Sequence, residues 1–307
     1  MKAALVRARS RYRLFRDFLR DWRRYQRFAT PLVSELTDRS DPRHLETHLT
    51  KDYHRVEKGL TLPTPKRPFG SDLLVRLDKV GTLADRMEAQ YPAREYAREA
   101  TSALCAWNGG GDQDSTLAPV LGTAGGALDP ETARRFFTTR RSVRHFDVAR
   151  EVPRAVLDSA VELAATAPSV CNRQPWKVRF FEGAAASAKA LAYQNGNRGF
   201  GESVPVTAVI SVDLRLFGQA GERNQAWIDG GIFLMNFVSA LHALGVTSCM
   251  LNLSLTSAKA DRLRDGLGLA AHEVPIAMVA IGYPATGARV ARSPRRLASD
   301  VATYVSG

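Results

Sequence analysis

The chain has 307 residues, of which 45% are hydrophobic and 24% are charged, a composition typical of a globular protein with a buried core. Its formal net charge is +12, but residues 1–30 hold ten Lys and Arg against two Asp, so this segment carries +8 and the remainder only +4. Because the basic charge belongs to one segment and no nucleic-acid-reading motif accompanies it, we expect no nucleic-acid partner.

Cysteine and histidine usage excludes two further classes of protein. Cys105, Cys171 and Cys249 are far apart, which suits neither a disulfide framework nor a zinc site, and the six histidines form no metal-binding motif. No apolar run reaches 18 residues, and the first residues lack the apolar stretch of a secretory signal. We therefore expect no metal site and a reducing, cytoplasmic setting.

The first 30 residues predict a basic amphipathic helix, because aromatic and leucine side chains recur at steps of three and four residues with arginines between them. Two interpretations remain open. In the first, the aromatic side packs against the body of the protein or a dimer partner; in the second, it lies on an anionic membrane surface as a peripheral contact. The repeating side chains are Tyr12, Phe15, Phe18, Leu19, Trp22 and Tyr25.

Residues 1–106 form the predicted helical N-terminal extension. A helix over 44–60 ends at Gly59, before a proline-rich stretch, and residues 72–105 repeat leucines at helical spacing. The charged sequence YHRVEKGL at Tyr53–Leu60 favours a local ion-pair cluster over a substrate contact. A Gly-rich stretch at 107–128 predicts a linker and lacks the spacing of a dinucleotide fingerprint.

Residues 129–307 predict a second domain of mixed helices and strands. Prolines at 130 and 153 each favour the start of a helix, and 228–244 and 258–267 are further helices. Four stretches are predicted strands, at 177–182, 206–212, 246–253 and 276–281, and 206–212 is a continuous apolar run suited to a buried strand.

Two polar motifs in this domain carry chemistry. Arg140–Phe146 reads RRSVRHF, and three guanidiniums beside a hydroxyl suit a dianionic phosphate, which arginine binds through two hydrogen bonds at once. Ala167–Trp176 reads APSVCNRQPW. Its Asn and Gln can donate and accept along the edge of a heterocycle, and the two prolines stiffen the loop.

The two motifs together, in this order and separated by a helix, resemble the FMN-dependent nitroreductase family, whose pattern is RRSxRxF followed by PSxxNxQPW. The resemblance covers roughly residues 135–307. It extends to NGNRGF at Asn195–Phe200, to the long helix and glycine-containing strand within Arg223–Leu253, and to Ile281–Pro284. Arg295 falls where the family places a second phosphate-binding arginine, but Ser293 stands where a lysine is common.

The resemblance implies an α+β fold of three layers, with a central mixed, mainly antiparallel sheet flanked by helices. It also implies a homodimer that holds FMN and uses NADH or NADPH in a ping-pong hydride transfer to a nitro compound, a quinone or another small acceptor. The flavin carries the chemistry, so no side chain is expected to be catalytic, and Cys171 and His145 are interpreted as structural. Some of the flavin contacts are expected to come from the partner subunit. The implied cofactor-binding residues are Arg140, Arg141, Ser142, Arg144, Pro168, Ser169, Asn172, Gln174, Asn197 and Arg295.

Two other functions stay open at this point. One is a specialised flavin-dependent dehydrogenase or flavin-processing enzyme, and the other is a flavin-binding, membrane-associated accessory protein. The sequence at Tyr53–Leu60 resembles an extension found on family members linked to cell-surface polysaccharide clusters, which bears on pathway rather than on chemistry.

Overall fold

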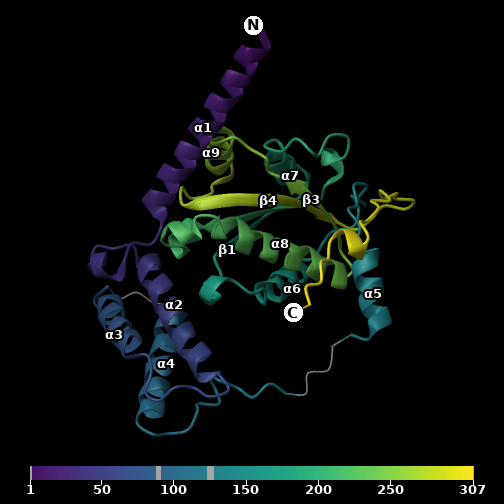
Figure 1. The fold of residues 1–307 in the computed structure, drawn as a ribbon. Helices are drawn as coiled ribbons and strands as arrows, with labels where there is room; N and C mark the ends of the chain where they lie inside the picture. Colours follow the sequence, from purple (N-terminus) through teal and green to yellow (C-terminus); the bar gives the residue numbers. More distant parts are fainter. Residues whose placement is uncertain (1, 88–90, 123–127, 307) are drawn as a thin grey trace.

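The computed structural model describes residues 2–87, 91–122 and 128–306 (Figure 1). The N-terminal region is helical, as predicted, and the remainder is a layered α+β unit. The N-terminal helices are α1 (Lys2–Phe28), α2 (Pro42–Leu60), α3 (Ser71–Arg86) and α4 (Pro92–Asn108).

Helices α2, α3 and α4 share one apolar core of their own, built mainly from leucine and alanine side chains. Helix α2 begins where the side chain of Asp41 accepts a hydrogen bond from the amide of Arg43 (2.9 Å). The charged residues near its end form local ion pairs: His54 contacts Glu57 at 3.0 Å, and Arg55 contacts Asp52 at 3.6 Å. This arrangement confirms the ion-pair interpretation of that stretch.

The stretch from 107 to 128 is only partly free of the helical region. Helix α4 continues to Asn108, whose side chain exchanges two hydrogen bonds with the backbone of Phe69 (3.0 and 2.9 Å). Leu117 and Ala118 pack against the core of α2–α4. Residues 123–127 of the predicted linker lie outside the described residues.

The C-terminal unit contains the four predicted strands in one sheet of order β1-β2-β4-β3. Every strand pair is antiparallel. Among the described residues, parallel pairing is limited to two isolated bridges, Ser142–Ser248 beside β3 and Thr30–Gly218. The elements are α5 (Pro130–Thr139), α6 (Arg154–Ala165), β1 (Trp176–Glu182), α7 (Ala184–Leu191), β2 (Val206–Asp213), α8 (Gln225–Ala243), β3 (Thr247–Asn252), α9 (Ser257–Leu267) and β4 (Glu273–Gly282).

The alternation of side chains along β4 produces the three layers, because neighbouring residues of a strand face opposite sides of the sheet. Val279 and Ile281 pack with α6 and α8 on one side, whereas Met278 and Ala280 pack with α7 and α9 on the other (Figure 1). Helix α8 lies unusually close to the sheet at Gly230, where an added Cβ would stand 2.6 Å from Ile276.

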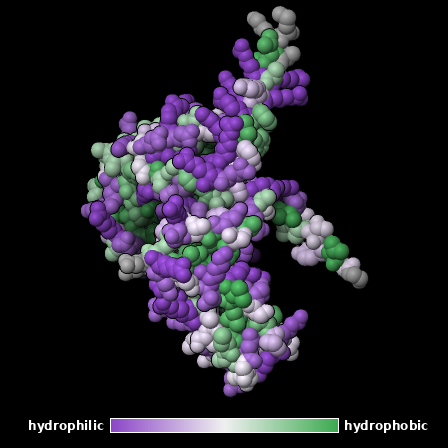
Figure 2. Space-filling model, turned by 90° about the vertical axis from the view of Figure 1, so that its left-hand side faces the viewer, coloured by the Kyte–Doolittle hydropathy of each residue, from purple (hydrophilic) through white to green (hydrophobic). Residues whose placement is uncertain are grey.

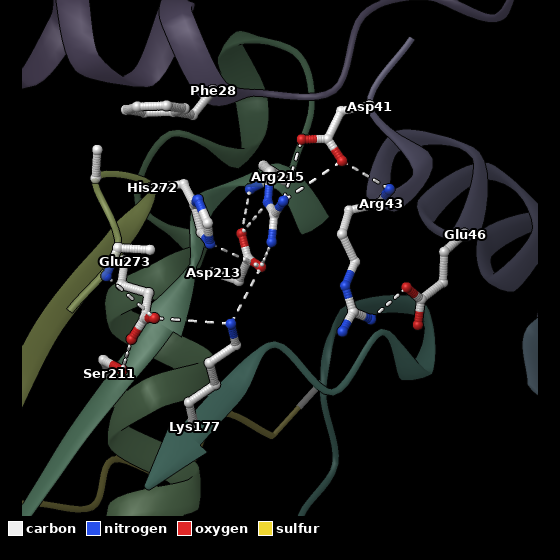
Figure 3. Close-up of polar contacts among 12 residues, drawn as sticks. Phe28, Asp41, Arg43, Glu46, Lys177, Ser211, Asp213, Arg215, His272 and Glu273 are labelled. Atoms are coloured by element: carbon white, nitrogen blue, oxygen red, sulfur yellow. Dashed lines mark hydrogen bonds and ion pairs between the residues drawn. The ribbon is translucent and has the colours of Figure 1, made fainter. Parts of the chain in front are cut away.

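A chain of buried and half-buried charges joins the helical region to the sheet (Figure 3). Arg215, just after β2, binds Asp213 at 2.7 Å and reaches Asp41 before α2 at 3.1 Å. Thr47 of α2 donates to the backbone oxygen of Arg215 (3.0 Å). The two regions are therefore connected by a specific polar contact as well as by the chain itself.

The first part of α1 projects away from the body (Figure 1). Tyr25 and Phe28 at its end pack on the C-terminal unit, but Tyr12, Phe15 and Trp22 are exposed. The interpretation that the aromatic side of this helix packs on the body of the protein is therefore wrong for the turns that carry Tyr12 and Phe15. No helix in the described part of the chain is long and apolar enough to cross a membrane.

Candidate functional site

The arginine-rich motif lies in an extended segment that follows α5 and runs beside β3. The amide of Val143 donates to the oxygen of Ser248 (3.1 Å), and the amide of Asp147 donates to that of Tyr283 (2.9 Å). Val143 and Phe146 are buried in the core, which holds the intervening polar residues at the surface.

The three arginines of this motif are not neutralised by the protein. Among the described residues, no carboxylate lies within ion-pair distance of Arg140, Arg141 or Arg144, although 16 such pairs occur elsewhere. The Nη1 of Arg141 donates only to the backbone oxygen of Arg140 (3.3 Å). Concentrated positive charge without a protein partner is suited to an anionic ligand.

A cavity of about 800 Å³ lies beside Arg144. Its opposite side is formed by the turn that contains Asn197 and Arg198, so the structure brings two predicted residues, Arg144 and Asn197, to one cavity. The side-chain Nδ2 of Asn197 donates to the backbone oxygen of Leu191 at the end of α7 (3.0 Å), which fixes the turn. A cavity of this size is in the range of small-molecule and cofactor sites.

The loop Pro168–Gln174 has a strained backbone. The backbone φ angles of Cys171, Asn172 and Gln174 are 49°, 53° and 46°. Residues other than glycine rarely adopt this left-handed region. The hydroxyl of Ser169 accepts from the amide of Gln174 (2.9 Å), and the Gln174 side chain donates to that of Asn172 (3.2 Å). Three strained residues in one short loop point to a functional constraint, because such strain is costly and clusters at ligand sites.

Arg173 holds this loop in place. Its guanidinium makes two hydrogen bonds to Glu222 (2.9 and 2.6 Å) and a third to the oxygen of Leu216 (2.8 Å), and its side chain is 1% exposed. Asp229 of α8 accepts from the amide of Val170 (3.2 Å). Sequence reasoning did not assign these three anchoring residues, because Glu222 and Asp229 lie 49 and 59 residues from their partners and no motif links them.

The two motifs lie at opposite ends of the sheet within one chain. The backbone oxygen of Pro175, next to the loop, accepts a hydrogen bond from the backbone amide of Asp213. Asp213 lies opposite Glu273, at the start of β4, in the strand pairing. Ser142 pairs instead with Ser248, whose partner Ile281 is eight residues further along β4. At about 3.4 Å per residue, this places the motifs roughly 27 Å apart. A single chain therefore does not unite them.

The remaining predicted residue, Arg295, lies away from both motifs, whereas Cys171 lies in the loop and Cys249 in β3. Arg295 is exposed on the C-terminal tail, where its Nη1 donates to the oxygen of Ser293 (2.7 Å), so the structure does not bring it to either motif. Burial raises the pKa of the Cys249 thiol against the opposing effect of Arg144, and Cys171 is half-buried. In residues 2–87, 91–122 and 128–306, no cluster of His, Cys, Asp or Glu could hold a metal ion.

Comparison with known proteins places the C-terminal half of the chain. The sequence model of the Nitroreductase family matches residues 137–192 and 180–283. An NADH dehydrogenase of Thermus thermophilus is 28% identical over 189 residues, which are 52% of this chain and 88% of that protein.

Solved structures show the same fold. A protein from Desulfovibrio desulfuricans, assigned as a nitroreductase and crystallised in complex with FMN, has a TM-score of 0.50 at 20% identity, covering 59% of this chain and 99% of that one. A Bacillus subtilis protein, also assigned as a nitroreductase, has a TM-score of 0.51 at 18% identity, covering 58% of this chain and 100% of that one. The expected nitroreductase-like fold is confirmed.

Proposed function

We propose, on the premise that the C-terminal half of this chain belongs to the Nitroreductase family, that the protein is an FMN-dependent oxidoreductase. It uses NADH or NADPH to reduce a small acceptor such as a nitro compound or a quinone. The observation that carries the proposal is the cluster of Arg140, Arg141 and Arg144, which has no carboxylate partner among the described residues. Arg144 of this cluster lines a cavity of about 800 Å³.

The arginine side of the site fits the phosphate end of FMN. Arg140, Ser142 and Arg144 would bind the dianionic phosphate and the ribityl chain, with Arg141 supporting them, because guanidinium groups form charge-assisted hydrogen bonds with phosphate. Asn197 lines the same cavity and would contact the cofactor from its opposite side.

The loop side fits the ring of the cofactor. Pro168, Ser169, Asn172 and Gln174 would contact the flavin edge, since the strained backbone presents amide and hydroxyl groups in fixed positions. Arg295 reaches this site only if the C-terminal tail of one copy lies against another.

A homodimer resolves the separation of the two motifs. A twofold axis can bring the loop of one chain to the arginine motif of its partner and form two equivalent sites. Helix α8 offers a surface for this contact, because Trp227 (54%), Ile228 (50%) and Met235 (43%) are exposed on it. Apolar exposure of this kind on one helix favours a protein–protein interface.

The chemistry in this proposal would be supplied by the cofactor, which could accept a hydride equivalent from NAD(P)H and pass two electrons to the acceptor. Because both reactants would use the same cavity in turn, the cycle would be ping-pong. The chain binds and orients the reactants and excludes water. The positive charge of Arg140, Arg141 and Arg144 favours binding of anionic species at this position. No side chain is required as a nucleophile or general acid.

Replacing Arg140 and Arg144 together by alanine should lower FMN retention by two orders of magnitude or more, because two charge-assisted contacts of about 1.5 kcal/mol each are lost. The matched control replaces Arg134 and Arg135, two exposed arginines on α5, and should leave FMN affinity within about twofold. Fluorescence titration of the reconstituted protein with FMN measures both. Unchanged FMN affinity in the Arg140→Ala/Arg144→Ala protein would contradict the assignment.

Mixing two defective proteins tests whether one site uses two chains. The first is Arg140→Ala/Arg144→Ala, and the second is Asn172→Gly/Gln174→Gly, in which glycine removes the side chains without straining the positive φ. If each site combines motifs from both chains, every mixed dimer has one intact site, and random exchange restores about a quarter of the sites. No recovery of NAD(P)H oxidation after subunit exchange would place both motifs in the site of a single chain.

A further inference from the structure

The projecting half of α1 is the largest feature of the chain that the proposed oxidoreductase does not use. Tyr12 and Phe15 are each 65% exposed. Phe18 (64%) and Trp22 (54%), nearer the body, are exposed as well, but they also line a cavity between α1 and the C-terminal unit. Figure 1 shows the helix extending beyond the sheet and its covering helices, and Figure 2 shows hydrophobic and hydrophilic side chains alternating along it. Exposed aromatic side chains in such number mark a surface that contacts something else.

These side chains are sorted by side around the helix. At about 100° per residue, the apolar side chains between residues 8 and 23 fall within an arc of roughly 160°, interrupted only by Arg11. The other arginines of this stretch fall within an adjacent arc of roughly 80°. The apolar arc contains Ala8, Tyr12, Leu14, Phe15, Phe18, Leu19 and Trp22, and the basic arc contains Arg9, Arg13, Arg16, Arg20 and Arg23.

The base of the helix is fixed to the C-terminal unit. Arg24 donates to the backbone oxygen of Ala271 (2.9 Å), and the hydroxyl of Tyr25 donates to that of Gln219 (2.8 Å). Phe28 packs edge-on against His272, with ring centroids 6.1 Å apart (Figure 3). The exposed turns therefore extend from a defined anchor, but they lack a surface to pack on, and packing of the amphipathic face supplies most of the stability of helices in proteins.

Charge decides which surface fits. Residues 1–30 carry +8 and the rest of the chain only +4, so a second copy offers no net negative charge and brings an equally basic helix. An anionic lipid surface has the complementary charge, and its interfacial zone accepts the aromatic side chains. The long side chain of Arg11 can extend from the apolar arc to the headgroups.

We propose that α1 docks on the surface of an anionic lipid bilayer, lying in the plane of the interface. Tyr12, Phe15 and Leu19 insert at the boundary between headgroups and acyl chains, and the basic arc binds the headgroups. The proposal goes beyond the redox function and does not depend on it, because it concerns where the chain is held and uses no residue of the candidate flavin site.

The test is co-sedimentation of the full-length protein with vesicles. Phosphatidylcholine vesicles containing about one third phosphatidylglycerol should retain the protein, and pure phosphatidylcholine vesicles should retain far less. The triple substitution Arg9→Gln/Arg13→Gln/Arg16→Gln should weaken partitioning to the anionic vesicles by roughly a hundredfold. Its matched control replaces Arg39, Arg86 and Arg154, three exposed arginines away from the projecting turns of α1, and should bind like the wild type.

An apolar pair tests the other side of the helix. Tyr12→Ala/Phe15→Ala keeps good helix formers while removing the inserting rings, and should weaken partitioning by roughly tenfold or more. Its matched control, Val120→Ala/Tyr304→Ala, removes two side chains that are 93% exposed elsewhere and should have no effect. Both sites lie outside the flavin site, so FMN affinity serves as the check that each variant is folded.

Four results would overturn the proposal. The first is equal retention on neutral and anionic vesicles, and the second is wild-type retention of the triple arginine variant. The third is a Tyr12→Ala/Phe15→Ala protein that loses self-association, measured by sedimentation velocity without lipid, but binds vesicles as the wild type does. That result would assign the aromatic side to contact with a second copy. Retention on duplex oligonucleotides with none on vesicles would likewise replace the bilayer by nucleic acid.

Discussion

Replacing Arg173 by methionine should destabilise the C-terminal unit strongly, because this residue anchors the loop that carries Ser169, Asn172 and Gln174. The Arg173 side chain is 1% exposed and that of Glu222 is 23% exposed. Methionine is of similar length but leaves the Glu222 carboxylate without its cationic partner, and it leaves the oxygen of Leu216 without a donor.

The expected cost is about 3 to 5 kcal/mol, the range for breaking a buried ion pair from one side. This is a large fraction of a typical unfolding free energy of about 5 to 15 kcal/mol. In urea it corresponds to a lowering of the unfolding midpoint by at least about 1 M. The double variant Arg173→Met/Glu222→Gln should recover part of the loss, since it also removes the stranded charge.

The pH dependence separates this pair from general loss of packing. Burial would raise the pKa of Glu222, but the Arg173 and Gly218 hydrogen bonds outweigh it and hold the pKa below the usual 4.5. The pair's contribution is therefore fully present above pH 4.5 and is lost as the pH falls through the lower, folded-state pKa. The difference between wild type and Arg173→Met should shrink in that window.

Urea unfolding followed by tryptophan fluorescence at pH 7 and pH 3.5 measures both effects. The matched control is Arg154→Met, which breaks an exposed pair with Glu182 (2.9 Å) and should leave the midpoint nearly unchanged. If Arg173→Met is as stable as this control at pH 7, the loop is not held by the ion pair and the reasoning is refuted.

Two further substitutions test the sheet. Glu273→Gln should cost about 3 kcal/mol of unfolding free energy at pH 7, because it leaves Arg179 without its carboxylate partner. Burial opposes the charge of Glu273, but hydrogen bonds from Arg179 outweigh this effect and lower the pKa of Glu273 to about 2. The loss of stability in urea unfolding should therefore fade as the pH drops from 4.5 toward 2, and a loss independent of pH would contradict this. Gly230→Ala should lower the unfolding free energy by about 1 to 3 kcal/mol in thermal unfolding, because the added Cβ would stand 2.6 Å from Ile276. The control Gly81→Ala, whose Cβ would have no atom within 4 Å, should raise the unfolding free energy slightly. Equal effects of the two substitutions would argue against close packing of α8.

The sequence was sufficient for β2 and β4 because both are mainly apolar runs, and both strands are indeed almost wholly buried. It was also sufficient for the fold, because two motifs separated by a helix form a specific pattern. Local charge balance similarly predicted the His54–Glu57 ion pair, whose partners are three residues apart on one helix face.

What the sequence did not reveal depends on contacts between distant residues. The order β1-β2-β4-β3 puts the two motifs at opposite ends of the sheet, and nothing local to either motif encodes that order. The Arg173–Glu222 pair is invisible for the same reason. Periodicity predicted that α1 is amphipathic but not that Tyr12 and Phe15 are uncovered, because the pattern of a helix does not say which surface covers it.

The most direct test of the proposed function is the visible absorption spectrum of the purified full-length protein, recorded anaerobically before and after addition of NADH or NADPH. Our account predicts the two absorption bands of bound flavin, which bleach when one of the nucleotides is added. A colourless protein that cannot be reconstituted with FMN would contradict it.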